Sequence, residues 1–280
     1  MANLSHPSSY LLRRDCNETV RLESQHLLWK LHTGYTIHPD IPIVDGMCVA
    51  DLGAGTGIWA LELAPQLPPS ARVIGYDISE STFPLSEYWP PNVSFSALDC
   101  LGEVPEALVG QFDVVHLRMW ALVIRGNNPS TLIRNAAKLL KPGGYLQWED
   151  APFGSVVARG ETALHVREMM RAINRFAKTD FRWLDQLQDH VQLATPDLKV
   201  VNCQKTMWAS YFIPLCMNTF MLALEDSGNM LDWLRLLDPR VVPSQAEWAA
   251  ALAALHEEMK KPGGGQYYWT PVNLLARKHS

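Results

Sequence analysis

The 280-residue chain has little positive charge and few cysteines, and both shortages narrow its possible functions. Its 24 lysine and arginine residues are outnumbered by 29 acidic residues, which gives a net charge of −5. Nucleic-acid binding usually depends on a basic surface, so we do not expect the chain to act on DNA or RNA. The five cysteines are odd in number and far apart, which argues against a disulfide framework and a zinc site. We therefore expect no metal, and a reducing, cytoplasmic compartment.

The chain also lacks the apolar segments that secretion or membrane insertion requires. Residues 1–10 are polar and show neither the basic nor the apolar block of a signal peptide, and no apolar run approaches membrane-spanning length. Internal repeats and low-complexity segments are missing as well. With 48% hydrophobic residues, the chain can bury a full core as one large domain or as a domain with a cap. We expect no association with a membrane.

The most informative segment is 49–57, in which two apolar residues and Asp51 precede three alternating glycines. The apolar residues predict a buried strand, and the glycines predict a turn whose backbone passes close to a ligand before a helix begins. A second apolar segment, 72–78, places Asp77 twenty residues after Gly57. This spacing fits a strand, a helix and a second strand, with Asp77 at the carboxyl end of the second strand.

Two kinds of nucleotide-like ligand fit such a turn. A dinucleotide-binding loop has glycine at its first, third and sixth positions, but the sixth position counted from Gly53 is Ile58. The match to the dinucleotide pattern therefore fails. The two oxygens of the Asp77 carboxylate can instead accept hydrogen bonds from both hydroxyls of a ribose. The turn and the acid together predict a cofactor that contains a ribose.

At this point the chain resembles the class I S-adenosylmethionine-dependent methyltransferases. Their first motif is similar to residues 51–57, and their ribose-binding acid corresponds to Asp77. A third strand ending at Asp99, a fourth strand over 112–118, and Lys-Pro-Gly-Gly at 141–144 before a fifth strand follow in the order of that family. The resemblance covers nearly the whole chain and is strongest from 48 to 150.

The resemblance also implies a set of cofactor-binding residues. Asp99 would accept a hydrogen bond from the adenine amino group, and Cys100 would lie against the adenine ring. The implied residues are Tyr10, Asp51, Gly53, Ala54, Gly55, Asp77, Ile78, Asp99, Cys100 and His116. The cofactor would be S-adenosyl-L-methionine, with S-adenosyl-L-homocysteine as its product.

The amino-terminal segment exceeds what a minimal methyltransferase requires. Asp15 or Asn17 can cap a helix that runs to about Leu31 and ends at Gly34. Its expected apolar stripe consists of Val20, Leu22, Leu27, Leu28 and Leu31. The segments 10–15, 21–30 and 34–39 resemble the front end of a fungal secondary-metabolite branch of the family. That resemblance implies helices folded over the cofactor, with Tyr10 either near its methionine end or anchoring the arm to the surface.

The predicted fold is α/β: a Rossmann-like, seven-stranded, mostly parallel sheet with an antiparallel last strand and helices on both faces. The expected parts are an amino-terminal helical arm or lid (1–40), a cofactor-binding core (41–150), a helical cap (151–197) and the remainder of the core (198–280). Helical spacing predicts cap helices over 162–178 and 183–193. The segment 266–278 fits the antiparallel strand, with Pro271 at a bulge or an unpaired position.

With this cofactor, we expect that holding an acceptor atom in line and excluding water is most of the catalysis. Where the acceptor must lose a proton, a histidine with a pKa of about 6.5 is the usual base. His116, at the end of the fourth strand, is the first catalytic candidate, and Glu149, at the end of the fifth, is the second. Each has a structural alternative: His116 as a neutral ring against the adenosine, and Glu149 as half of an ion pair.

The leading hypothesis is methyl transfer from S-adenosylmethionine to an oxygen or nitrogen of a small-molecule secondary metabolite. Two alternatives stay open. One is a pericyclase or eliminase that keeps the cofactor without transferring its methyl group, and the other is a non-catalytic cofactor-binding module. The expected partner is a small-molecule acceptor, and we expect a monomer or a homodimer.

Overall fold

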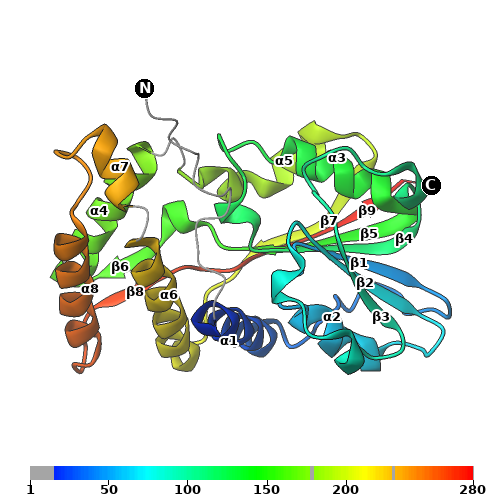
Figure 1. Cartoon of the computed structure of the whole chain (residues 1–280), viewed down its shortest axis with the longest axis horizontal. Coiled ribbons are helices and arrows are strands. Elements are labelled where there is room, and N and C mark those ends of the chain that lie inside the picture. The colour runs from blue at the N-terminus through cyan, green and yellow to red at the C-terminus, as the bar shows by residue number, and fades with distance from the viewer. Residues whose placement is uncertain (1–15, 177–179, 229–230, 280) are drawn as a thin grey trace.

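Seven strands form one sheet in the order β3-β2-β1-β4-β5-β9-β7 (Figure 1). The computed structural model describes residues 16–176, 180–228 and 231–279. The strands are β1 (Cys48–Leu52), β2 (Arg72–Asp77), β3 (Val93–Ala97), β4 (Phe112–Arg118), β5 (Leu140–Asp150), β7 (Leu198–Lys205) and β9 (Val272–Lys278). β9 runs antiparallel to β5 and β7, and the pairings among β1 to β5 are parallel. The predicted fold class is confirmed.

Burial of both sheet faces explains why the central strands are so apolar. All five residues of β1 are buried, and β4 is buried over most of its length. α3 (Ser130–Leu139) and α5 (Leu187–Ala194) cover one face, and α1 (Cys16–Thr33) and α2 (Ile58–Leu63) lie on the other (Figure 1). Parallel strands need crossover helices, which cover the faces and bring the carboxyl ends of the strands to one edge. Ligands of such sheets bind at that edge.

The remaining helices form a second, smaller unit beside the sheet (Figure 1). They are α4 (Glu161–Phe176), α6 (Ile213–Ser227), α7 (Leu231–Leu237) and α8 (Gln245–Met259). α4 and α6 contact a short ribbon in which β6 (Val157–Arg159) pairs with β8 (Gln266–Tyr268). Trp29 of α1 joins the apolar core of this unit, so α1 connects the two parts. In the described ranges, no helix has the length and apolar character needed to cross a membrane.

The segment 266–278 forms two strands rather than the single strand predicted. β8 ends at Tyr268 and pairs with β6, whereas β9 begins at Val272 and pairs with β5 and β7. Pro271 between them has no N–H to offer a sheet, and its carbonyl accepts a hydrogen bond from Thr206 N at 3.1 Å. The interruption expected at Pro271 is present, but it separates two sheets.

The two helices expected in the cap pack in different places. α5 packs against α3 and β7, whereas α4 packs against α8. α6 and α8, expected with the core, share the apolar core of α4. The boundary at residue 197 stays a prediction, and the packing groups the helices across it. Helical spacing identifies a face that is buried, but not the surface that buries it.

α1 turns a polar face inward, so the predicted apolar stripe is wrong for much of its length. Val20, Leu27 and Leu31 are 51%, 56% and 45% exposed. The buried residues of this helix are Glu18, Arg21, Gln25, His26, Leu28 and Trp29. The inward face is polar because part of it borders ligand-sized cavities instead of a core.

Candidate cofactor and acceptor site

The glycine turn between β1 and α2 has a left-handed backbone. Gly53, Gly55 and Gly57 have φ values of 72°, 56° and 76°, in a region that residues with a Cβ rarely adopt. Gly53 N donates to Tyr76 O at 2.8 Å, which ties the turn to β2. A Cβ at Gly53 would lie 3.0 Å from Trp120 Cζ2. This position therefore needs glycine for its conformation and for the space beside it.

A cavity of about 330 Å³ lies beside the turn, at the carboxyl-end edge of the sheet. Its size falls within the roughly 300–1,000 Å³ typical of small-molecule sites. Asp77, Ile78, Asp99 and Cys100 line it. Ile78 is 59% exposed, so it offers apolar surface that a flat ring can cover. Burial raises the pKa of the Cys100 thiol to about 12, so this side chain stays neutral.

The two acids of this cavity keep hydrogen-bonding capacity for a ligand. Asp77 Oδ2 accepts from Gly55 N at 3.0 Å, and Oδ1 accepts from Ser79 N at 3.1 Å. Asp99 Oδ1 accepts from Leu101 N at 3.0 Å. Each carboxylate oxygen has two lone pairs, so these bonds fix the carboxylates without saturating them. These acceptor oxygens suit the hydroxyls of a ribose and the amino group of a purine.

A smaller cavity of about 70 Å³ adjoins the first, and Gly53 and Met119 line both. Asp51 and His116 line only the smaller one. Asp51 Oδ1 lies 2.7 Å from His116 Nδ1, and the His116 ring stacks on Trp59 with centroids 3.8 Å apart. The His116 side chain is only 1% exposed. These contacts fix both the ring and the carboxylate at the edge of the cavity.

Glu149 is fully buried and fixes Arg118 in the cavity wall. Arg118 Nε and Nη2 lie 2.7 and 2.5 Å from Glu149 Oε2, and Gln147 Nε2 donates to Oε1 at 2.9 Å. His116 Nε2 lies 3.5 Å from Glu149 Oε2. Burial would raise the pKa of Glu149, but Arg118 and His116 lower it to about 2. The Glu149 carboxylate is therefore ionised, with both oxygens engaged.

His26 of α1 extends this series of polar contacts. Its Nδ1 lies 2.8 Å from Arg118 Nη1, and its Nε2 lies 2.6 Å from Glu62 Oε2. A guanidinium only donates, so Nδ1 must accept and Nε2 must carry the proton. Burial and the neighbouring Arg118 lower the pKa of His26 to about 3, which agrees with a neutral ring. Lys30 forms an ion pair with the other oxygen of Glu62.

The family of the chain follows from comparison with known proteins. Residues 49–144 match the family described as "Methyltransferase domain". The methyltransferase grgD from Penicillium sp. is 31% identical over 209 residues, which cover 72% of this chain and 72% of that relative. The chain belongs to the class I S-adenosylmethionine-dependent methyltransferases. Its cofactor is S-adenosylmethionine, and the product form of that cofactor is S-adenosylhomocysteine.

A second relative and a solved structure are also similar to this chain. The methyltransferase is 26% identical to the N-methyltransferase tcpN from Claviceps purpurea, over 91% of this chain and 93% of that relative. Its fold is similar to that of phosphoethanolamine N-methyltransferase 2 from Haemonchus contortus, with a TM-score of 0.53 and 15% identity over 95% of this chain and 53% of that chain. The second likeness concerns the fold alone. The curated relatives named here are fungal, as the amino-terminal motifs predict.

The described part of the predicted cofactor site is assembled around the two cavities of this methyltransferase. Asp51, Ala54 and His116 line the smaller cavity, Asp77, Ile78, Asp99 and Cys100 line the larger, and Gly53 and Gly55 line both. Tyr10 lies outside the described residues. Glu149 lies behind Arg118 rather than in either lining. Which of these residues bind the cofactor, and which act in catalysis, stays a prediction.

The resemblance implied helices over the cofactor, but sequence reasoning did not identify which residues of α1 line the cavities or the backbone conformation of the turn after β4. Glu18 and Gln25 of α1 line the cavities, and Met119 lines both. Met119 has a φ of 59°, which is uncommon outside glycine and recurs at functional sites. The recurrence of polar residues at 18, 21 and 25 was a usable sign of a polar inward face. The backbone conformation of Met119 leaves no comparable sign in the sequence.

Proposed function

We propose that this methyltransferase methylates a nitrogen atom of a small-molecule secondary metabolite. The observation that carries the proposal is a third cavity, of about 40 Å³, which shares Leu22 and Met119 with the cofactor cavities. Phe153, Phe220 and Trp269 also line it. A narrow aromatic gap next to the methionine end suits one small planar group and does not suit a polymer.

The roles of the chain follow from this arrangement. S-adenosylmethionine, when bound, supplies a methyl group made electrophilic by the sulfonium. Asp77 and Asp99 would hold the ribose and the adenine, and Asp51, fixed by His116, would face the methionine end. Met119 and the aromatic walls would exclude water and hold the acceptor in line, which is most of the catalysis for a strong electrophile.

The lining of the acceptor gap favours nitrogen over oxygen as the acceptor atom. His116, His26 and Glu149 are not among the described residues that line it, so none of the three faces the acceptor as a base. His116 Nε2 has no hydrogen-bond partner among the described residues, but it is buried beside Glu149 rather than in this gap. A neutral amine carries its own lone pair, whereas a hydroxyl needs its proton removed. The name of the relative tcpN also supports nitrogen. In this proposal His116 and Glu149 are positioning residues.

Carbon-13 methyl-labelled S-adenosylmethionine and a panel of matched amines and alcohols test the proposal. We expect a labelled N-methyl product in an amount equal to the S-adenosylhomocysteine formed. Faster labelling of the alcohols would overturn the choice of nitrogen. Conversion of an acceptor without S-adenosylhomocysteine would identify pericyclic or elimination chemistry instead. Retained cofactor affinity with no product across the panel would point to a non-catalytic module and would overturn the proposal as a whole.

A further inference from the structure

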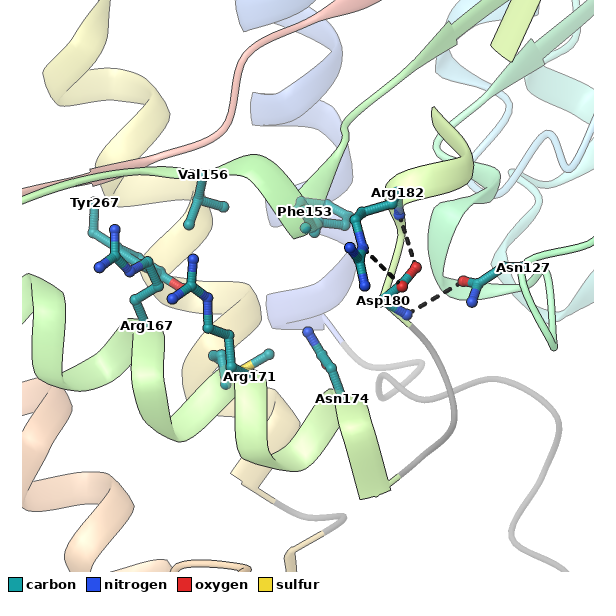
Figure 2. Close-up of a pocket in the computed structure, with 11 residues that line it drawn as sticks. Asn127, Phe153, Val156, Arg167, Arg171, Asn174, Asp180, Arg182 and Tyr267 are labelled. Atoms are coloured by element: carbon teal, nitrogen blue, oxygen red, sulfur yellow. Dashed lines mark hydrogen bonds and ion pairs between the residues drawn. The ribbon is translucent and has the colours of Figure 1, made fainter. Parts of the chain in front are cut away.

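A further cavity of about 500 Å³ lies outside the cofactor site of the methyltransferase. It is bounded by α4, by the turn at Phe153 and by the segment 180–182. Figure 2 shows Arg167, Arg171 and Asn174 extending from α4 into the space beside Phe153 and Val156. None of the predicted site residues that the structure describes lines this cavity, so its side chains call for a separate explanation.

Two of the lining arginines stand one turn apart on the same helix. Arg167 and Arg171 occupy positions i and i+4 of α4, and both line the cavity. Like charges at this spacing destabilise an isolated helix by about 0.2–0.5 kcal/mol. Glu168 forms an ion pair with both arginines and offsets part of this repulsion. A bound anion between the two guanidinium groups would offset the rest.

Among the described residues, the side chains at this cavity carry more positive charge than the acids beside them neutralise. Arg182 Nε donates to Asp180 Oδ2 at 2.9 Å, and Arg171 Nη1 donates to Glu168 Oε1 at 2.8 Å. Arg167 Nε is buried and has no hydrogen-bond partner among the described residues, with Glu168 Oε1 at 3.5 Å. A buried donor without an acceptor is unfavourable. Arg167 is therefore the group that most needs an anionic partner.

Tyr267 adds a neutral donor to the same wall. Its ring stacks on Phe220 with centroids 5.3 Å apart and an interplanar angle of 3°. Burial raises the pKa of its hydroxyl, and the nearby Arg167 and Arg171 lower it less. The hydroxyl thus stays protonated at neutral pH and can donate to an anion.

Phe153 connects this cavity with the acceptor gap. It lines the arginine-rich cavity and also the narrow cavity that contains Met119. The two cavities are therefore neighbours on either side of this ring. We infer that the acceptor extends past Phe153 and carries a carboxylate, bound by the guanidinium groups of Arg167 and Arg171. Guanidinium forks match a carboxylate in geometry and charge. The inference rests on the proposed function, because it names the acceptor of that same site.

A matched pair of probes tests the inference. 3-Phenylpropionate has an aromatic ring and a carboxylate, and 3-phenylpropanamide has the same shape without the charge. Binding of each is measured by ligand-observed NMR on the full chain with S-adenosylhomocysteine present. We expect the carboxylate to bind about tenfold to a hundredfold more tightly than the amide. Equal binding of the two, or no binding of the carboxylate, would overturn the inference.

Substitutions then show which side chains cause the preference for the carboxylate over the amide. Arg167→Met and Arg171→Met should each reduce the preference for the carboxylate at least tenfold. Arg240→Met removes the same charge at a residue whose side chain is 88% exposed and ion-paired to Asp238, and should leave the preference unchanged. Preference retained in both cavity variants would place the anion elsewhere and overturn the inference. Affinity for S-adenosylhomocysteine, measured by calorimetry on each variant, shows whether it still folds.

The binding probes and the methylation assay distinguish failure of the carboxylate inference from failure of the proposed function. Formation of N-methyl product from uncharged amines, with no carboxylate preference, would leave the proposed function intact and remove the inference. Carboxylate binding that depends on Arg167 and Arg171, without formation of S-adenosylhomocysteine, would establish an anion site and contradict its assignment to a methyl acceptor.

Discussion

The two sides of the active-site region differ in charge. The cofactor cavities are lined by the carboxylates of Glu18, Asp51, Asp77 and Asp99 and by the guanidinium groups of Arg118 and Arg125. The cavity beyond Phe153 is lined by Arg167, Arg171 and Arg182, with Asp180 as its carboxylate. Clefts of one sign concentrate ligands of the other sign. A cationic donor and an anionic acceptor would therefore be directed to their own sides before they meet at Met119.

The two sides also differ in how firmly they are held. Asp77 is fixed by two backbone N–H groups next to the glycine turn. Arg171 and Arg182 sit on long side chains that are 53% and 77% exposed. Ordering an arginine side chain costs up to about 2 kcal/mol of rotamer entropy. The residues around Asp77 are therefore preordered, whereas Arg171 and Arg182 would lose rotamer entropy on binding the proposed acceptor.

The largest expected effect comes from removing the Glu149 carboxylate, which neutralises Arg118 in the wall of the cofactor cavities. Glu149→Gln would leave Arg118, whose side chain is 13% exposed, without its ion-pair partner. Removing one member of a buried pair typically costs about 3–5 kcal/mol. The free energy of unfolding from urea denaturation should fall by that amount. The double variant Arg118→Met/Glu149→Gln should recover part of the loss, because no buried charge stays unpaired. A loss below about 1 kcal/mol in the single variant would contradict the importance of this ion pair.

The next effect is expected from a substitution at Gly53, in the glycine turn that borders the cofactor cavities. Gly53→Val places a branched side chain at a φ of 72°, with its Cβ 3.0 Å from Trp120 Cζ2. Gly110→Val is a matched control, because Gly110 has a φ of 66° and nothing within 4 Å of its Cβ position. Backbone strain should cost both variants about 1–2 kcal/mol, and overpacking should cost Gly53→Val about 1–3 kcal/mol more. Calorimetry should show lost S-adenosylhomocysteine affinity in Gly53→Val alone, and equal affinities would mean that the turn does not border the ligand.

The lining of the cofactor cavities could be predicted from the sequence, because the residues that define it form short local patterns. Gly53 and Gly57 are required by backbone conformation, and Asp77 follows an apolar segment at a spacing that one crossover helix fixes. Such features need only a few neighbouring residues to be recognised. The strand order then brings Asp99 to the same edge of the sheet. A local pattern and one general topology were sufficient for most of this site.

The arginine-rich cavity beyond Phe153 could not be predicted in the same way. Phe153, Arg167, Arg182 and Tyr267 come from segments up to about a hundred residues apart, and tertiary packing alone brings them together. The inward face of α1 was mispredicted for a related reason. Apolar spacing locates the buried side of a helix only where a core covers it. Where a cavity covers the helix, the buried side is polar, and residues such as Gln25 appear solvent-exposed in the sequence pattern.

A smaller effect is expected from substitution of Asp77, the acid that we expect to bind the ribose. Asp77→Ala should remove a charge-assisted contact of about 1.5–3 kcal/mol, so calorimetry should show S-adenosylhomocysteine affinity reduced roughly tenfold to a hundredfold. Asp77→Asn keeps one side-chain oxygen and should lose less. Asp45→Ala, at an exposed acid before the amino end of β1, should leave the affinity unchanged. Unchanged affinity in Asp77→Ala would move the ribose away from this acid and weaken the contrast between the two sides.

The smallest effect expected is a pH dependence, which tests whether His26 stays neutral beside Arg118. The folded protein lowers the pKa of His26 from 6.5 to about 3, mainly by burial and then by Arg118. The unfolded chain therefore binds a proton first as the pH falls through 6.5, and the folded state is destabilised. Linkage gives a loss of about 1 kcal/mol between pH 6.5 and 5.5 from this group. Urea denaturation at the two pH values should show that His26→Gln lacks this loss.

Asp150 makes the comparison with His26→Gln necessary. Burial raises the pKa of Asp150 from 3.8 to about 6, against four N–H donors that lower it. The folded state thus takes up a proton below pH 6 that the unfolded chain takes up only below about 4, and acid stabilises the fold through this group. As the pH falls, the two residues change the free energy of unfolding in opposite directions. The pH dependence of the wild-type protein alone therefore does not separate their effects. The difference between wild type and His26→Gln isolates the histidine, and an identical pH dependence in the two proteins would show that the fold does not lower the pKa of His26.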